Sequence, residues 1–297
     1  QYTSSAASDV YKRQTLSGMA FNAVEAATTE LGTTKGGWVY AGQRPCYEAK
    51  TPAFYVLEHP LTHRQVIQAM NVEGESSDRP MDELTSLDVK ELAHHVMAQD
   101  DYAAVVNELP GAWEVRPLTQ AEWVAAKAQK KLALDSGLTE RLADAPASNN
   151  RGAMMDGRPR PNDLLGPAAH QIAAIAVHPR NPDVTAVGSV PYDRPLPNVV
   201  ARLALTPVRE GIAPRVPAQT DVWKNVRSEL LWTTVLGIVP SFLIPVLRGM
   251  SDYAIEGWFN LLFGGLLAGF FTGAIWRPKR PVLTYDEVDS SSMSVAQ

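Results

Sequence analysis

Two uncharged apolar stretches constrain this chain more than any other feature. They cover 230–247 and 258–276 and are separated by a short polar loop. Each approaches the ~20 residues that a helix needs to cross a hydrocarbon core of ~30 Å. Pro240 and Pro245 interrupt the first stretch, and prolines are tolerated in membrane helices when neighbouring groups satisfy the backbone. We therefore predict a transmembrane hairpin whose first span is kinked. The alternative is a pair of buried soluble helices, but the rest of the chain is too small to cover both.

The basic residues that flank the two stretches predict an orientation. Lys224 and Arg227 precede the first stretch, and Arg277, Lys279 and Arg280 follow the second. Cytoplasmic segments next to membrane spans are enriched in Lys and Arg. We therefore expect a multi-pass membrane protein with two spans, inserted in the lipid bilayer with its N- and C-termini in the cytoplasm.

Glycine recurs every fourth residue in the second stretch, at Gly265, Gly269 and Gly273. Small residues at this spacing let helix backbones approach closely. The stripe predicts packing against the first span or self-association with a second copy. The simpler interpretation is that glycine is common in membrane helices.

Length and composition bound the remaining organisation. A chain of 297 residues with 45% hydrophobic content can hold one compact domain and a membrane hairpin, and its net charge of −5 argues against nucleic-acid binding. Polar, proline-rich segments at 149–162 and 179–198 predict long surface loops. The expected organisation is a disordered tail or an adapter-derived artefact at 1–14, a domain at 15–210, a linker at 211–228, the hairpin at 229–277 and a disordered cytoplasmic tail at 278–297. If 1–14 is an artefact, we expect the true start upstream, either a short way before Thr15 or beyond a further domain.

The segment 115–123 reads Val-Arg-Pro-Leu-Thr-Gln-Ala-Glu-Trp. Thr119 and Glu122 have the spacing of a capping box, in which each side chain hydrogen-bonds the other residue's backbone amide. A helix should begin after Thr119, with Trp123 as its bulky anchor. For Arg116, binding a ligand is one possible role, but we expect a structural ion pair with a carboxylate such as Glu58 or Asp88.

This segment resembles the Arg-Leu-Pro-Thr-Glu-Ala-Glu-Trp signature of the formylglycine-generating-enzyme (sulfatase-modifying factor) family. Similar landmarks follow the family order: a strand within 52–66, the Pro80 to Asp88 segment, a faint match at 162–166 and a closing strand at 201–205. The resemblance covers about 36–208 and implies an α+β, loop-rich, C-type-lectin-like domain. It implies structural roles for the signature residues Pro80, Asp88, Arg116, Thr119, Ala121, Glu122 and Trp123.

The resemblance does not extend to the chemistry of the family. Its aerobic members bind copper through two cysteines near the C-terminal end of the domain and oxidise a substrate cysteine, whereas this chain has one cysteine, Cys46, near the start. The segment 170–177 lacks the carboxylates that calcium prefers. We therefore predict a pseudoenzyme with no catalytic residue and no metal. Copper or calcium would be expected only in an active relative.

Other candidate sites are weak. His94 and His95 are adjacent, so on a helix they point in different directions and cannot share a metal. Asp100 and Asp101 lack further oxygen ligands at a fixed spacing and indicate a solvated helix end. Gly36 and Gly37 lack the Lys of a phosphate loop and predict a turn into a strand at 38–40.

Three functions are compatible with these patterns. The preferred one is a membrane-anchored, non-catalytic binding or sensing module for a cytoplasmic protein or small ligand. The second is a divergent formylglycine-generating oxidoreductase acting on a protein cysteine, which would need another thiol or a different metal site. The third is an oligomeric membrane-assembly protein that associates through its glycine face.

Overall fold

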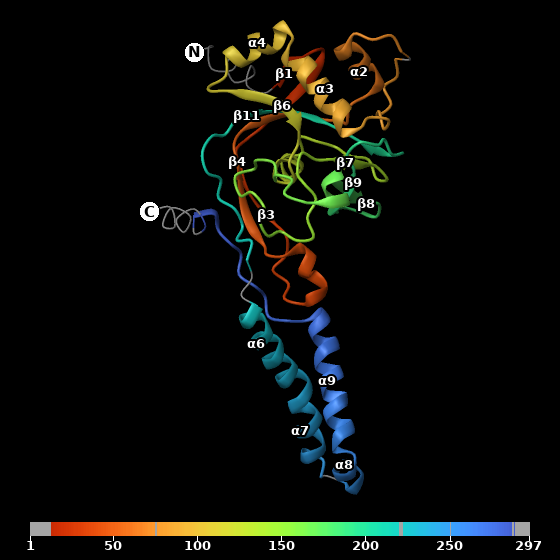
Figure 1. Cartoon of the computed structure of the whole chain (residues 1–297), viewed down its shortest axis with the longest axis vertical. Helices are drawn as coiled ribbons and strands as arrows, with labels where there is room; N and C mark the ends of the chain where they lie inside the picture. The colour runs from red at the N-terminus through yellow and green to blue at the C-terminus, as the bar shows by residue number, and fades with distance from the viewer. Residues whose placement is uncertain (1–12, 75, 220–221, 250, 287, 289–297) are drawn as a thin grey trace, which may run out of the picture. The chain divides into compact units, whose positions relative to one another are not determined.

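The computed structural model describes residues 13–286 and 288, apart from 75, 220, 221 and 250. The chain divides into two compact units (Figure 1). The described residues of the first unit extend up to Glu30 and include Glu48–Ala147 and Met154–Pro214. The second unit holds Leu31–Tyr47, Ser148–Ala153 and the described residues from Arg215 onward. Two short segments of the expected 15–210 domain therefore belong to the second unit.

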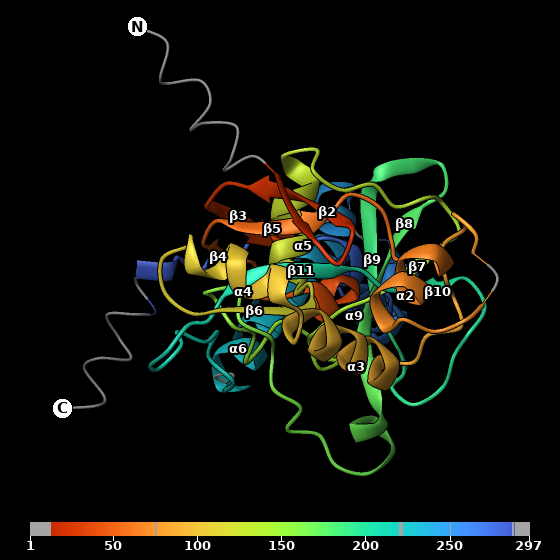
Figure 2. The same cartoon turned by 90° about the horizontal axis from the view of Figure 1, so that it is seen from above.

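A five-stranded antiparallel sheet forms the framework of the first unit. Its strand order is β1-β2-β5-β11-β6, and Figure 2 shows β2, β5, β11 and β6 side by side. The expected strand within 52–66 is β5, and the expected closing strand corresponds to β11. The five strands are β1 (Arg13–Leu16), β2 (Met19–Val24), β5 (Phe54–Leu57), β6 (Trp113–Pro117) and β11 (Leu203–Pro207).

The first strand includes two residues that the sequence analysis assigned to the N-terminal tail. Arg13 and Gln14 pair with Asn22 and Phe21 of β2. The prediction that these two residues belong to the tail is therefore wrong. Strand formation here depends on pairing with β2, and the composition of the segment gives no sign of that partner. The rest of that predicted tail, residues 1–12, lies outside the described residues.

A second sheet has the order β10-β7-β8-β9, in which only the β10 and β7 pair is parallel. The prediction of a long loop at 179–198 is wrong, because β9 pairs with β8 along most of its length. Proline is compatible with this position, since β9 is an edge strand. The strands are β7 (Thr139–Arg141), β8 (Gln171–His178), β9 (Asn181–Pro191) and β10 (Val199–Val200), while β3 (Ala27–Leu31) and β4 (Tyr47–Thr51) form a separate pair.

Three of the described helices in this unit begin with a capping box. The pairs are Thr62 with Gln65, Thr85 with Asp88, and Thr119 with Glu122. The third was predicted from the sequence and is confirmed. The helices are α2 (His63–Met70), α3 (Ser86–Met97), α4 (Asp100–Asn107) and α5 (Gln120–Ala128), and η2 (Gly166–His170) is a short 3-10 helix.

Apolar clusters cover both faces of the five-stranded sheet, and β5 contributes to both. Tyr55 and Leu57 pack with residues of α2 and α3, whereas Phe54 and Val56 pack with residues of α5 and β8. This follows from the alternation of side chains along a strand. Burying a large apolar side chain stabilises a fold by about 1.5–3 kcal/mol relative to leaving it exposed. The two clusters therefore position α3 and α5 on opposite faces of the sheet.

The second unit contains the apolar hairpin. Two helical segments, Val222–Leu247 and Trp258–Ile275, are long and apolar enough to cross a membrane. The first begins earlier than the expected 230 and takes in part of the predicted linker. Figure 1 shows α6 and α7 beside α9. The elements are α6 (Val222–Thr233), the π-helical η3 (Thr234–Ile238), α7 (Val239–Leu247), α8 (Asp252–Glu256) and α9 (Trp258–Ile275).

Two of the three stripe glycines of α9, Gly265 and Gly269, contact the first helix of the same chain. A Cβ on Gly265 would lie 2.6 Å from Ser241 Oγ, and a Cβ on Gly269 would lie 2.8 Å from the carbonyl oxygen of Thr233. A Cβ on Gly273 would collide with the guanidinium of Arg277. All three glycines are buried. Gly265 and Gly269 therefore pack against the first helix of the same chain, and self-association with a second copy stays a prediction.

Two other segments of this unit differ from expectation. The predicted strand at 38–40 is instead the 3-10 helix η1 (Trp38–Gln43), in which Trp38 packs against Phe270 with ring centroids 5.7 Å apart. The described part of the predicted disordered tail is held by hydrogen bonds, since Arg280 N donates to Thr34 and Leu283 N donates to Cys46. Both differences arise from contacts between segments distant in sequence.

Candidate functional site

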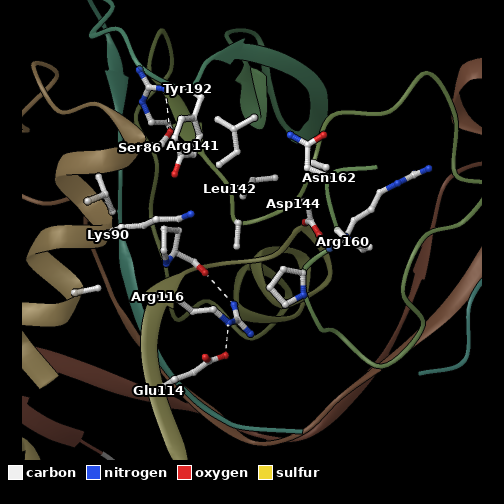
Figure 3. A pocket seen from close by; sticks show the side chains of 18 of the residues that line it. Ser86, Lys90, Glu114, Arg116, Arg141, Leu142, Asp144, Arg160, Asn162 and Tyr192 are labelled. Atoms are coloured by element: carbon white, nitrogen blue, oxygen red, sulfur yellow. Dashed lines mark hydrogen bonds and ion pairs between the residues drawn. The ribbon is translucent and has the colours of Figure 1, made fainter. Parts of the chain in front are cut away.

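A pocket of about 670 Å³ opens beside α3 in the first unit. Its walls come from one face of α3 and from β6. Arg141 at the end of β7, the residues after it and 159–162 add to these walls, together with the start of β8 and Tyr192 just after β9. Figure 3 shows side chains from these elements pointing into a common space. The pocket exists because the two sheets and α3 meet here.

Arg141 forms one end of the pocket and is 1% exposed. Its guanidinium donates to the carbonyl oxygens of Pro191 at 2.5 Å and Arg194 at 2.7 Å, and to Ser86 Oγ at 3.4 Å. Its Nε has no hydrogen-bond partner in the part of the chain that the structure describes. Burial lowers the pKa of Arg141, and the carboxylate of Asp88 only partly offsets this. Arg141 therefore contributes a buried positive charge that neutral carbonyl groups hold in place.

Lys90 supplies a second cation at the same end. It lies four residues after Ser86 in α3, so the two side chains share one face of the helix. Its ammonium lies 5.1 Å from the centre of the Tyr192 ring, within the range of a cation–π contact. Within the described part of the chain, neither Lys90 nor Arg141 forms an ion pair with a carboxylate. Their charges are available to a ligand.

Asp144 lies on the opposite wall (Figure 3). Its carboxylate accepts hydrogen bonds from the backbone amides of Gln120 at 2.6 Å and Arg160 at 2.7 Å. Burial raises the pKa of Asp144 to about 6, although these two hydrogen bonds act in the opposite direction. The carboxyl therefore changes charge close to neutral pH.

Arg116 lines the base of the pocket, but its charge is already matched. Its Nη atoms each lie 2.8 Å from a carboxylate oxygen of Glu122, and its Nε lies 2.9 Å from Glu114 Oε1. The predicted ion pair is present, but the expected partners, Glu58 and Asp88, are wrong. Burial lowers the pKa of Arg116, but the two carboxylates outweigh it and raise the pKa overall.

Glu122 is fully buried and accepts more than this one pair. Thr119 N donates to it at 3.0 Å, Thr206 Oγ1 at 3.1 Å and Arg209 Nη2 at 3.0 Å. Burial alone would raise the pKa of Glu122, but Arg116 and the other donors lower it overall. The capping box is thus also the centre of a buried ionic cluster.

A second buried ion pair joins α5 to the two sheets. Arg202 donates to Glu140 through Nε at 2.9 Å and Nη2 at 3.0 Å, and Trp123 Nε1 donates to the same carboxylate at 3.0 Å. Arg202 also donates to the carbonyl of Leu57 at 3.0 Å. The predicted anchoring role of Trp123 therefore includes a polar contact.

The structure brings some of the predicted signature residues together and separates others. Arg116, Thr119, Ala121, Glu122 and Trp123 lie in or next to the start of α5, and Ala121 and Trp123 are buried. Pro80 forms an isolated bridge with Thr62, away from this cluster. Asp88 caps α3, accepting from Thr85 N at 2.8 Å.

The remaining candidates show separate local contacts. His94 lines the pocket, whereas the ring of His95 hydrogen-bonds the carbonyl of Glu91. Asp101 accepts from the backbone of Ser17. Cys46 is buried in the second unit. Among the described residues, no group of three or more His, Cys, Asp or Glu side chains could hold a metal ion.

Sequence reasoning missed Lys90, Arg141 and Asp144. Arg141 follows the buried Glu140 in the short strand β7, and this pair forms no distinctive local pattern. The pocket itself joins segments that are far apart in sequence. Arg202 did give a signal, because it interrupts the apolar run at 201–205. A charge in such a run indicates a buried partner.

Comparison with known proteins adds remote structural likenesses. No family model matches the sequence, and no curated protein matches it significantly. PvdO from Pseudomonas aeruginosa is 12% identical with a TM-score of 0.46, covering 64% of this chain and 95% of PvdO. Treponema denticola variable protein 1 is 14% identical with a TM-score of 0.45, covering 66% of this chain and 99% of that protein. These likenesses assign neither fold nor function.

What the described residues define is a mixed α+β protein with several sheets. Its C-terminal region carries two helices that are long and apolar enough to span a bilayer.

Proposed function

We propose that this chain is a membrane-anchored, non-catalytic binding module. Its α+β unit recognises a cytoplasmic ligand in the pocket beside α3, and the apolar hairpin fixes it in the lipid bilayer. The observation that carries the proposal is the pocket itself, because Lys90 and Arg141 line it and neither forms an ion pair with a carboxylate of the described residues. Pockets that join apolar walls to a few directed polar groups are typical ligand sites.

A formylglycine-generating-enzyme-like, C-type-lectin-like scaffold is part of this proposal. Its support is the signature segment, where Thr119, Glu122 and Arg116 form one buried cluster and Trp123 is fully buried. These contacts support the proposed structural role of the signature residues, beside a pocket that we propose for recognition.

The proposed binding module carries out no copper-dependent oxidation. Copper-dependent oxidation of a substrate cysteine, as the resemblance implies it, uses two thiolates. The single cysteine, Cys46, lies in the second unit rather than in the pocket wall. The proposed ligand is therefore bound and not oxidised, and copper and calcium have no proposed role.

The proposed membrane role rests on the surface of the hairpin. Large side chains of α7 and α9 are exposed, among them Leu243, Phe263 and Phe271. A bilayer would cover such a surface. With both ends of the hairpin in the cytoplasm, the loop around Asp252 lies on the other side. Self-association would use a face of the hairpin away from Gly265 and Gly269, because the first helix covers these two glycines.

Ligand-detected NMR on the full chain in phosphatidylcholine nanodiscs tests the pocket. The probe is a library of small acids, amines and neutral aromatic compounds. Ala169 lines the pocket and its neighbour Ala168 does not. Ala169→Trp should abolish specific binding, and Ala168→Trp should preserve it. Absence of any binder, or equal binding by both variants, would overturn the binding proposal.

Cysteine labelling in intact cells tests the membrane arrangement. A membrane-impermeant maleimide should label Asp252→Cys and not Lys279→Cys, with the parent chain as control because Cys46 is buried. The reverse pattern would overturn the orientation, and recovery of the protein in the soluble fraction would overturn the anchor.

A further inference from the structure

We propose that the pocket beside α3 selects an organic anion that carries one carboxylate on an apolar body. This inference rests on the proposed binding function, because it names the ligand class of the same pocket.

The Ser86 end of the pocket carries a buried positive charge. Arg141 is 1% exposed, and its three hydrogen-bonding partners are neutral oxygens of Ser86, Pro191 and Arg194. Its Nε is buried and has no partner among the described residues. A buried charge is costly unless an opposite charge or hydrogen bonds compensate it. The carboxylate of Asp88 offsets this cost only in part, and an anionic ligand would add a counter-charge inside the pocket.

Lys90 adds a second cation at the same end of the pocket. Figure 3 shows this side chain reaching from α3 into the space between Arg141 and Arg116. The Tyr192 ring lies beside its ammonium, and Ser86 links the same helix face to Arg141. Lys90 and Arg141 thus belong to one cluster. Charge-assisted hydrogen bonds from such cations are stronger than neutral ones.

Carboxylates elsewhere in the pocket limit the ligand to a single negative charge. Glu114 and Asp144 line other parts of the same pocket. Arg116 faces the pocket, but Glu114 and Glu122 already neutralise it. A second negative group on the ligand would approach these carboxylates, and Figure 3 shows the guanidinium of Arg160, a further lining residue, directed away from Lys90. A monoanion at the Lys90 end avoids this repulsion.

The body of the ligand would contact apolar walls of the pocket. Val89, Met97, Leu142 and Ile172 contribute apolar side chains to the walls. A cavity of about 670 Å³ is large enough for an aromatic or branched aliphatic group. The pocket therefore pairs a cationic end with an apolar remainder.

The experiment uses matched acid and amide pairs on the full chain in phosphatidylcholine nanodiscs. The probes are N-acetyl-phenylalanine, indole-3-acetate and benzoate, each beside its carboxamide, with phenyl phosphate as a dianionic probe. Titration by ligand-detected NMR gives the dissociation constants. At least one acid should bind about tenfold more tightly than its amide, as expected for loss of a charge-assisted contact, and more tightly than phenyl phosphate.

Substitution of Lys90 identifies the cation. Lys90 is exposed, so replacing it leaves the core intact. Lys90→Gln should weaken acid binding about threefold to fivefold, and Lys90→Glu should weaken it further, while amide binding stays unchanged. The matched control is Lys35→Gln, which removes another lysine that lies over a tyrosine, Tyr40, in the other unit. This variant should bind the acids as the parent does.

The binding results distinguish failure of the anion preference from failure of the proposed binding function. Neutral or amine probes that bind in an Ala169→Trp-sensitive way, with no preference for acids, would overturn the anion and leave the binding function standing. Binding of phenyl phosphate more tightly than the carboxylic acids would overturn the limit of one negative charge on the ligand. Acid binding that ignores Lys90→Glu would overturn the assigned cluster. If no probe of any class binds, the proposed function fails as well.

Discussion

Arg116 binds Glu122 through two parallel hydrogen bonds of 2.8 Å, and the Glu122 side chain has no exposure to solvent. This bidentate pair connects β6 to the first turn of α5. Because Arg209 shares the same carboxylate, Glu122 holds two cations at once. The pair therefore secures the base of the proposed ligand pocket.

Removing the charge of Glu122 should be strongly destabilising. Glu122→Gln leaves Arg116 and Arg209 buried without their shared counter-charge, and breaking a buried pair costs about 3–5 kcal/mol. The measurement is the urea midpoint of the full chain in detergent micelles, with hydrogen exchange of the α5 peptides as a local readout. Glu114→Gln is the matched control, because Glu114 pairs with Arg116 from a side chain that is 42% exposed. It should cost at most about 1 kcal/mol. Equal effects of the two substitutions would contradict the buried pair.

The capping threonines offer a comparison of matched sites. Loss of a capping hydroxyl typically costs about 1 kcal/mol. Thr119→Ala should cost more than Thr85→Ala, because the Thr119 hydroxyl is buried and also donates to the carbonyl of Gly157 at 3.1 Å. Hydrogen exchange of the amides in α5 and α3 reports each helix start. A larger effect at Thr85 would refute the added role of Thr119.

Asp144 should make stability depend on pH in a defined direction. An unfolded aspartate ionises near pH 4. Its folded-state pKa is raised to about 6, so the folded chain retains the proton more tightly. This contribution to stability is complete below about pH 4 and is lost as the pH rises through about 6. Between pH 4 and 7 the parent should therefore lose stability relative to Asp144→Asn. The exposed Asp135→Asn is the control and should follow the parent, whereas parallel profiles for all three would rule out the shift.

Neighbouring glycines in α9 should respond differently to enlargement. A Cβ on Gly265 meets Ser241 within 2.6 Å, whereas a Cβ on Gly264 meets nothing within 4 Å. Gly265→Leu should therefore separate the two helices and Gly264→Leu should not. The exciton signal of the Trp232 and Trp276 pair, whose centroids are 5.5 Å apart, reports helix contact in circular dichroism. An unchanged signal in Gly265→Leu would argue against the packed hairpin.

Several features followed from the sequence because their causes are local. Thr119 and Glu122 are three residues apart, so the capping box could be predicted from spacing alone. The apolar stretches predicted two long helices for the same reason, since length and hydropathy are properties of contiguous residues. The strand expected within 52–66 came instead from the family resemblance, and it is present as β5 (Phe54–Leu57).

Tertiary structure decided the partners. Arg116 had several carboxylates within reach of a plausible pairing, and only the path of β6 beside α5 selected Glu122. The edge strand β9 depends on β8, which supplies its hydrogen bonds. The cationic end of the pocket joins Lys90 of α3 to Tyr192 after β9, and no short pattern relates residues so far apart. The sequence by itself determined where helices and apolar spans form, because propensity and hydropathy act locally. Which charges are matched and which face a pocket was decided by the fold, because electrostatic pairing depends on distance in space.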